Sequence, residues 1–470
     1  MDLNAQFKSL QSEYKTNPYP SIIERKKLLK ILKEGLQNDA CDLAAAISKD
    51  FSSRSEDETL FLEVFPTIKA INFCLKKMKR WMRNRSRNVS WMFVPARAYV
   101  APQPLGVVGI IVPWNYPLYL ALVPAVYALA AGNRVMIKMS ELSPNLARIL
   151  STIVSSLGLK HFILIIEGDS EVAKEFSALP FGHLLFTGST SVGKAVMLTA
   201  SKNLTPVTLE LGGKSPALVS ASMNPKYFDR LFMGKLFNAG QTCIAPDYIL
   251  IPHGWQAKVE EEFKRLQQIH YPDLKNNNHY SSIISEHHKQ RLLDLIQDAK
   301  DKGARVLQLG ELDPISRKIP VFLLFDVTKE MKVMQEEIFG PIVPVISYKS
   351  FHEAIEFINS FPNPLALYYL GENRQEIGYI KTQTLSGALT INDTLIQVAV
   401  DDLPFGGVGM SGMGQYHGQE GFDTFSKLKP VFIQSRLATF PLFYPPYGIL
   451  MRKFLALVGG IKIRKKNEVT

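Results

Sequence analysis

The sequence predicts an α/β protein built around parallel sheets. Short apolar runs rich in β-branched residues recur along it, separated by segments with the apolar period of a helix. This is the pattern of parallel strands joined by helical crossovers. The chain has 470 residues, too many for a single core, since a domain holds roughly 100–200 residues. Hydrophobic residues make up 46% and charged residues 21%, a balance that favours a soluble folded protein over a disordered chain.

The first block of elements begins with helices and continues as strands alternating with helices. Residues 20–49 and 56–84 have helical periodicity, and a strand is expected near 98–102. Further strands are expected at 107–112, 135–138, 162–166 and 183–186, with helices at about 143–157, 170–178 and 191–201.

A long uncharged stretch lies between Arg97 and Arg134. Its length suggests a membrane span. Prolines at 102, 104, 113, 117 and 124 interrupt it, and no single helix tolerates that many. We therefore expect a buried strand, a Pro-bounded turn (PWNYP) and a buried helix ending near Ala131.

A second alternating block starts at Val207, so two α/β domains joined near Thr205 are predicted. Its strands are expected at 207–209, 217–219, 248–251, 321–324, 342–346, 367–370 and 388–391. Its helices are expected at about 229–239, 257–269, 286–302, 351–359 and 374–382.

The net charge of +11 is concentrated in two clusters, 76–87 and 452–466. No nucleic-acid-binding motif accompanies either cluster, so nucleic acid is excluded as a partner. The segment 437–461 is apolar but broken by prolines and by the pair Arg452–Lys453. We interpret it as an arm across a partner subunit or as a peripheral contact with the inner membrane surface.

The three cysteines, Cys41, Cys74 and Cys243, form neither a disulfide framework nor a zinc site, and no metal is expected. The first residues lack the apolar core of a signal peptide. A reducing, cytoplasmic setting is predicted.

Two motifs carry groups capable of acyl chemistry. Cys243 lies in the loop FNAGQTCIAPD, where a thiolate would be a strong nucleophile; the alternative is an ordinary buried thiol. Glu210 ends a strand ahead of two glycines in TLELGGKSP, where α/β proteins place functional groups; the alternative is a solvated acid.

Three further motifs follow predicted strands. FTGSTSVGK contains Gly188, Ser189 and Gly193, suited to a phosphate at a helix N-terminus or simply to a helix cap. Asn115 in PWNYP offers an amide to a developing oxyanion, or makes an Asx turn. Lys138 and Glu141 in IKMSE could hold ribose hydroxyls, or form a solvated pair.

Together, in this order and spacing, these motifs resemble the aldehyde dehydrogenase superfamily from about Pro20 to Pro430. The matching segments are PWNYP, IKMSE, FTGST, ELGGK, FNAGQTC, QEEIFGP (335–341) and LPFGGVGMSGMG (403–414). QTCIAPDY, HYSSIIS and GQYHG are similar to the class 3 branch. The ending, with FSKLKPVF and FYPPYG, resembles bacterial coniferyl-aldehyde-type members of that branch.

The resemblance implies four regions. A Rossmann-type NAD(P)-binding domain would span 1–81 and 103–206, and an α/β catalytic domain 207–393. A small β oligomerisation arm would combine 82–102 with 394–436, and an apolar-basic tail would occupy 437–470. The family resemblance also implies a homodimer.

The resemblance implies a role for each site residue. Cys243 matches the catalytic thiol, Glu210 the general base and Asn115 the oxyanion-holding amide. The cofactor-binding positions are Pro113, Trp114, Lys138, Glu141, Gly188, Ser189, Gly193, Glu337 and Phe339. One departure is Met139, where many relatives have proline. His417, in GQYHG, is interpreted as a loop or helix-cap residue outside the catalytic set.

The expected reaction is NAD(P)-dependent oxidation of an aldehyde to a carboxylic acid through a thiohemiacetal and a thioester on Cys243. The nearest alternative is a CoA-acylating or acyl-phosphate-reducing enzyme on the same fold, which generally lacks a carboxylate at the position of Glu210. A cysteine hydrolase is disfavoured because no histidine lies in a hydrolase motif, and a catalytically silent scaffold because Cys243, Glu210 and Asn115 are all present.

Cofactor and substrate preferences are expected from the neighbouring residues. Glu141 should accept hydrogen bonds from a free 2′-hydroxyl and repel a 2′-phosphate, so NAD is favoured, with NADP also accepted. Trp114, Tyr116 and Tyr119 beside Asn115 suit an aromatic or medium-to-long aliphatic aldehyde, although core packing would use the same residues.

Overall fold

The computed structural model describes residues 2–438 and 440–462, and its contacts divide the chain into two units. One unit combines the chain up to Trp81 with residues 104–426, and the other combines 82–103 with the chain from 427 onward. The first unit contains two separate sheets and carries every residue of the predicted site.

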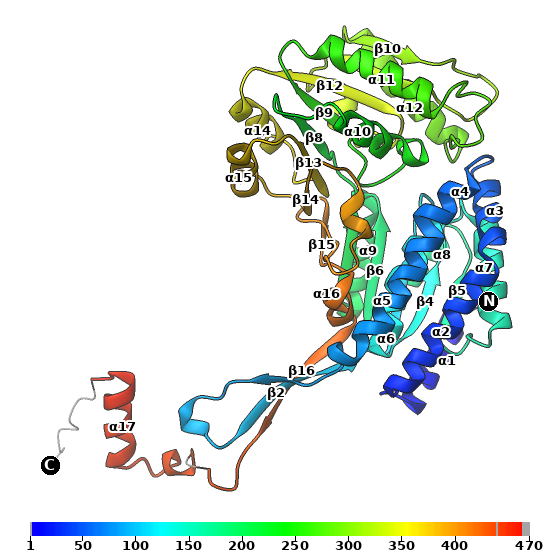
Figure 1. The fold of residues 1–470 in the computed structure, drawn as a ribbon. Helices are drawn as coiled ribbons and strands as arrows, with labels where there is room; N and C mark the ends of the chain where they lie inside the picture. The colour runs from blue at the N-terminus through cyan, green and yellow to red at the C-terminus, as the bar shows by residue number, and fades with distance from the viewer. Residues whose placement is uncertain (1, 439, 463–470) are drawn as a thin grey trace. The chain divides into compact units, whose positions relative to one another are not determined.

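The first sheet has six strands in the order β15-β7-β6-β3-β4-β5 (Figure 1). All neighbours pair in parallel except β15, which runs antiparallel to β7. The strands are β3 (Val107–Ile111), β4 (Arg134–Lys138), β5 (Ile163–Ile166), β6 (His183–Gly188), β7 (Val207–Leu211) and β15 (Gly412–Met413). Their connections contain α6 (Pro117–Ala131), α7 (Pro144–Ser156), α8 (Ser170–Ser177) and α9 (Thr190–Ala200).

The uncharged stretch forms the buried strand and helix expected from its proline pattern. All five residues of β3 and all fifteen of α6 are buried, which explains why this stretch carries no charge. Pro117 begins α6, where a missing N–H costs nothing. Among the residues described, no helix is long and apolar enough to cross a membrane.

N-terminal helices cover this part of the unit. Ser21 and Glu24 form a reciprocal capping box at the start of α2. The helices are α1 (Leu3–Thr16), α2 (Ile22–Asn38), α3 (Ala40–Asp50), α4 (Glu56–Thr59), a π-helical turn (Leu60–Val64), α5 (Phe65–Trp81) and, late in the chain, α16 (Gly418–Thr424).

The second sheet has seven strands in the order β10-β11-β12-β9-β8-β13-β14, parallel except for the β10–β11 pair. The strands are β8 (Pro216–Val219), β9 (Tyr248–Pro252), β10 (Arg305–Leu309), β11 (Val321–Phe325), β12 (Ile342–Tyr348), β13 (Ala366–Leu370) and β14 (Ala388–Ile391). The helices are α10 (Tyr227–Leu236), α11 (Gln256–His270), α12 (Glu286–Asp301), α13 (Lys332–Gln335), α14 (Phe351–Asn359) and α15 (Arg374–Gln383).

The second unit is a three-stranded sheet followed by a tail. Its strands are β1 (Arg85–Arg87), β2 (Arg97–Pro104) and β16 (Ser426–Ile433), and the tail contains α17 (Ile449–Gly459). Leu450 and Leu457 on α17 are largely exposed. Pairing with a second copy through this unit, and contact of 437–470 with a membrane, stay predictions; residues 463–470 lie outside the described part.

Three details differ from the sequence-based expectation. The strand β7 pairs with β6 in the first sheet, so it does not open the second block. Several elements were not predicted: the helices α1, α13, α16 and α17 and the strands β1, β10, β15 and β16. The stretch 394–426, assigned to the arm from sequence, groups with the first unit, because β15 pairs with β7 and α16 packs on α6.

Candidate active site

One cavity of about 500 Å³ collects most of the predicted site. Nine of the twelve predicted residues line it: Pro113, Trp114, Asn115, Gly188, Ser189, Glu210, Cys243, Glu337 and Phe339. Lys138, Glu141 and Gly193 do not line it.

The strand order of the first sheet explains why residues distant in sequence meet. The chain leaves β3 toward β4 on one side, and β6 later pairs on the other side of β3. Strand connections diverge at such a point and open a crevice at the carboxyl edge. Residues 113–115 follow β3, Gly188 ends β6 and Glu210 lies near the end of β7.

Asn115 is held against the loop that carries Cys243. Its side-chain Nδ2 donates to the backbone oxygen of Gln241 at 3.1 Å. The next residue, Tyr116, shares a hydrogen bond of 2.7 Å with the hydroxyl of Thr242, directly before Cys243. Since Asn115 Nδ2 has a second hydrogen, the amide can donate to another acceptor in the cavity.

Glu210 is a buried carboxylate whose two oxygens make no hydrogen bond with the described residues. Burial raises the pKa of this carboxyl well above its usual range. A carboxyl group that faces a cavity without a protein partner is placed to exchange a proton with a molecule that enters it.

The Cys243 thiol lies half-buried at the same cavity. Burial first, and then the carboxylates of Glu337 and Glu210, raise its pKa to about 12. The backbone N–H groups of Cys243 and Ile244 oppose this rise. The thiol is therefore protonated at neutral pH in the protein alone, and any positive charge brought into the cavity would favour its thiolate.

Gly188 and Ser189 form the turn between β6 and α9. Ser189 caps α9, its hydroxyl accepting from the N–H of Val192 at 3.4 Å. A Cβ at Gly188 would meet the ring of Phe186 at 2.6 Å, and one at Gly193 would meet Leu211 at 2.6 Å. Gly193 thus allows close packing of helix on strand, a role beside the cavity.

Glu337 and Phe339 line the cavity from the second half of the unit. The backbone N–H of Gly213 donates to Glu337, and a Cβ at Gly212 would overlap its carboxylate, so a side chain there would displace Glu337 from this position. Burial, followed by the carboxylate of Asp247, raises the pKa of Glu337 to about 8. The ring of Phe339 packs edge-on against Trp114 at a centroid distance of 5.4 Å.

Lys138 and Glu141 follow β4, one strand beyond β3 at the same carboxyl edge. Lys138 Nζ is buried and donates to the backbone oxygen of Met139 at 2.8 Å, whereas Glu141 is exposed. The N–H of Met139 donates to Ile166 at 3.0 Å. A proline there could not make this bond, so methionine at position 139 extends the β4–β5 pairing.

A second cavity of about 320 Å³ meets the first at Cys243. Leu120 and Phe405 also line both cavities. Most of the wall is apolar, including Phe61, Phe65, Tyr119, Ile244, Leu395 and Ile396. Sequence analysis identified Tyr116, Tyr119 and Cys243 but missed the rest, which come from segments far apart in the chain.

Other residues near the site gave no recognisable sequence signal. Arg54, Glu58 and Glu63 are buried charged residues behind Asn115. Lys214, in ELGGK, pairs with Asp247. His417 occupies the N-cap position of α16, as the cap interpretation expected, but its ring contacts the hydroxyl of Tyr119 at 3.3 Å instead of capping the helix.

Comparison with known proteins identifies the family to which the chain belongs. The model of the aldehyde dehydrogenase family matches residues 2–431. A probable coniferyl aldehyde dehydrogenase of Pseudomonas aeruginosa is 47% identical, covering 96% of this chain and 95% of its own length. The aldehyde dehydrogenase family 3 member A2 of Pongo abelii is 40% identical, covering 94% of this chain and 95% of its own length.

A solved structure of Staphylococcus aureus AldH in a substrate-bound state has the same fold. Its TM-score is 0.92 at 36% identity, covering 97% of this chain and 100% of the other. The predicted fold class and the resemblance inferred from the motifs are confirmed.

The electrostatics of the thiol can be tested in the protein alone. Glu337→Gln should speed alkylation of Cys243 by iodoacetamide about three- to tenfold at pH 9.5, because removing a nearby negative charge lowers the thiol pKa. At pH 6.5, below the pKa of about 8 for Glu337, the carboxyl is already neutral and the rates should agree. Mass spectrometry of the Cys243 peptide measures this, with Glu336→Gln as the neighbouring control. Equal rates at pH 9.5 would show that the thiol does not feel this charge.

Proposed function

Because the chain belongs to the aldehyde dehydrogenase family, we propose that it oxidises an aldehyde to the carboxylic acid through a thioester on Cys243. The observation that carries this proposal is the place of Cys243, where an apolar cavity meets a second cavity whose lining includes the polar side chains of Asn115 and Glu210. An aldehyde in the apolar cavity would present its carbonyl to the thiol, with the amide and the carboxylate on the polar side.

The steps follow from the chemistry of these three side chains. The Cys243 thiol first loses its proton to water, and the resulting thiolate attacks the carbonyl carbon. The oxyanion then accepts hydrogen bonds from Asn115 Nδ2 and the Cys243 backbone N–H. Each such donor is worth about 3 kcal/mol of transition-state stabilisation. Loss of hydride from the former aldehyde carbon leaves a thioester. Glu210 takes a proton from water as the water oxygen attacks the thioester; the C–S bond then breaks, which releases the carboxylic acid and regenerates the Cys243 thiolate.

A nicotinamide dinucleotide, NAD or NADP, supplies the acceptor for the hydride when it is bound. The carboxyl edge of the first sheet fits such a molecule, because the ends of β4, β3, β6 and β7 follow one another across about 14 Å at the usual strand spacing. The adenosine ribose would be held by Lys138 and Glu141, and the phosphates by Gly188 and Ser189. The wall of the crevice beside the cofactor would be formed by Pro113 and Trp114. Glu337 and Phe339 would hold the nicotinamide ribose.

The alternative on this fold passes the thioester to CoA or works on an acyl phosphate. Glu210 argues against it, because a buried carboxyl beside the thiol that makes no hydrogen bond with the described residues suits the activation of water. CoA-dependent turnover after a rapid first turnover would favour the alternative.

The apolar cavity supports an aromatic or medium-to-long aliphatic aldehyde as substrate. Phe61, Phe65, Leu120 and Ile396 on its wall offer carbon surface to an extended chain or a ring. Similar proteins bear names that refer to coniferyl aldehyde and to 4,4′-diaponeurosporen-aldehyde.

Replacement of the base should separate the two halves of the reaction. Glu210→Gln should give a burst of about one reduced cofactor per subunit and then turn over about 100-fold more slowly, since a general base contributes 10²–10⁴-fold. Stopped-flow absorbance at 340 nm measures both phases. Cys243→Ala, the control, should show neither phase. A Glu210→Gln enzyme with native steady-state turnover would remove Glu210 from the mechanism.

Replacement of Glu141 should change cofactor choice. Glu141→Gln should raise kcat/KM for NADP about tenfold and lower it for NAD, because the carboxylate no longer repels a 2′-phosphate. Glu167→Gln is a matched control, since Glu167 is an exposed acid that follows β5, the next strand. A native enzyme as efficient with NADP as with NAD would show that Glu141 does not discriminate.

Chain length should govern activity if the apolar cavity takes the substrate. Across the series from butanal to octanal, kcat/KM should rise about three- to fourfold per methylene, the value of about 0.8 kcal/mol per buried CH₂. The kcat/KM for cinnamaldehyde should exceed that for acetaldehyde by at least the total factor that separates octanal from butanal. A flat series, measured as initial rates of cofactor reduction, would place the substrate elsewhere.

A further inference from the structure

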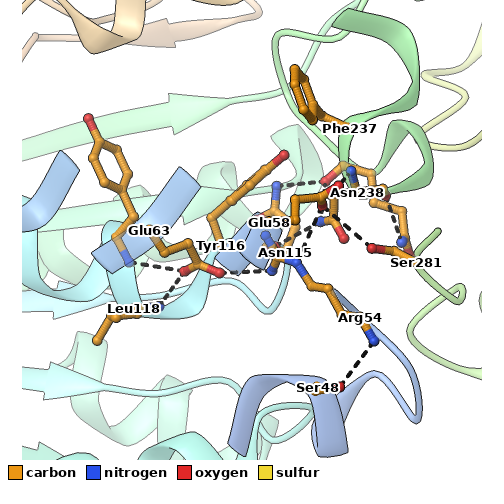
Figure 2. Close-up of polar contacts among 12 residues, drawn as sticks. Ser48, Arg54, Glu58, Glu63, Asn115, Tyr116, Leu118, Phe237, Asn238 and Ser281 are labelled. Atoms are coloured by element: carbon orange, nitrogen blue, oxygen red, sulfur yellow. Dashed lines mark hydrogen bonds and ion pairs between the residues drawn. The ribbon is translucent and has the colours of Figure 1, made fainter. Parts of the chain in front are cut away.

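One arginine and two glutamates lie buried behind Asn115, outside both cavities (Figure 2). Arg54 Nη1 donates to Glu63 Oε1 at 2.8 Å and to the backbone oxygen of Asn115 at 3.1 Å. Its guanidinium lies against the rings of Phe51 and Tyr116, at 5.1 and 4.9 Å from their centroids. The arginine therefore has a single fixed position, and that position reaches the backbone of the proposed oxyanion donor.

Glu63 fixes the start of the helix that follows Asn115. Its second oxygen accepts the backbone N–H groups of Leu118 and Tyr119 at 2.8 and 3.1 Å. These are among the first N–H groups of α6, which have no partner within the helix. Glu63 lies in the π-helical turn Leu60–Val64, an irregularity often found at functional sites. One carboxylate thus ties the first turn of α6 to Arg54.

Glu58 fixes the loop that carries Cys243. Its Oε1 accepts the backbone N–H of Asn238 at 2.9 Å and lies 3.6 Å from Arg54 Nε. Asn238 and Ala239 both have φ of +52°, a left-handed conformation that non-glycine residues adopt only when held there. The side chain of Asn238 also donates to the backbone oxygen of Asn115 at 2.9 Å.

The three residues therefore join two segments that must meet for catalysis. The Asn115 backbone oxygen accepts from Arg54 on one side and from Asn238 on the other. The side-chain amide of Asn115 in turn donates to the backbone oxygen of Gln241, in the loop that carries Cys243. A shift of about 1 Å between an oxyanion donor and a nucleophile can cost 100-fold in rate, so a rigid connection between these segments has catalytic value.

Building on the function proposed above, we propose that Arg54, with Glu58 and Glu63, is a positioning residue that sets the Asn115 amide against the Cys243 loop. None of the three touches either cavity, so they act only through the residues they hold. Burial raises the pKa of Glu58 to about 6 and the charge of Arg54 opposes that rise, so the carboxylate is ionised at neutral pH and accepts the Asn238 N–H strongly.

Arg54→Lys tests the connection with a matched control in the same unit. A lysine cannot donate to Glu63 and to the Asn115 oxygen in the same fixed geometry. We expect Arg54→Lys to lower kcat 10- to 100-fold and to change KM for the aldehyde less than threefold. The control is Arg25→Lys: Arg25 is equally buried and donates to the backbone oxygens of Pro20 and Ala130 at 2.9 Å each, near the other end of α6. We expect Arg25→Lys to lower the melting temperature of the protein and to leave kcat within twofold of the native value.

A second pair keeps the test valid if Arg54→Lys does not fold. Glu58→Gln retains an oxygen that accepts the Asn238 N–H, whereas Glu58→Met does not. Glu58→Gln should keep at least a third of native kcat, and Glu58→Met should lose at least tenfold more than Glu58→Gln. Equal kcat for the two variants, or equal losses for Arg54→Lys and Arg25→Lys, would reduce the three residues to a structural role.

A double-mutant cycle with Asn115→Ala separates this proposal from the function on which it builds. If Arg54 acts through Asn115, adding Arg54→Lys to Asn115→Ala should slow the reaction less than threefold further. Fully multiplied losses would overturn the positioning role while leaving the proposed reaction intact. If Asn115→Ala itself has native kcat, the oxyanion assignment fails, and the proposed function fails at that step independently of Arg54.

Discussion

The parallel pairing of β3 with β6 is the constraint on which the site depends. It places the end of a strand that leads to β4 beside the end of a strand that leads to β7, so the two connections diverge. The register aligns Ile111 with Phe186, and Thr187 with Glu210. Residues after β3, residues after β6 and the acid on β7 therefore reach the same edge at the same height. A one-residue slip would turn Glu210 to the other face of the sheet.

The crevice made in this way shields its ionisable side chains from bulk water, which disfavours their charged forms. Burial raises the pKa values of Cys243, Glu210 and Glu337 together. In the protein alone the thiol, with a pKa of about 12, holds its proton at neutral pH, which keeps it from reacting indiscriminately. The two cavities that meet at Cys243 therefore have separate roles. A positive charge that enters the cavity lined by Asn115 and Glu210 would lower the pKa of the thiol, whereas the apolar wall of the other cavity selects the aldehyde that the thiol attacks.

The sequence predicted the strands and most of the site because both leave local signals. Continuous apolar runs mark buried strands such as β3, and the groups at Cys243, Glu210 and Asn115 lie in recognisable motifs. Membership of a sheet leaves no local signal, because it depends on which distant strand pairs, and β7 was assigned to the wrong block for that reason. α1 was missed since it buries only Phe7 and Leu10, and β10 because it is a half-exposed edge strand. The apolar cavity was largely missed because its wall is assembled from separate segments that look like ordinary core.

Contacts between distant segments also explain why sequence analysis did not identify Arg54, Glu58 and Glu63. The burial of these three charged side chains argues that their role is geometric. Desolvation raises the pKa of both glutamates, which means that burying their charges costs free energy. Buried ion pairs seldom return more than that cost, and apolar side chains of the same volume often stabilise a fold as well or better. An apolar trio here would pack against Phe51 and Tyr116 but could not accept from Leu118, Tyr119 and Asn238 or donate to Asn115. What the charges add over an apolar core is therefore direction: outside the trio, they bond to backbone atoms of Asn115, of the first turn of α6 that follows it and of the loop that leads to Cys243.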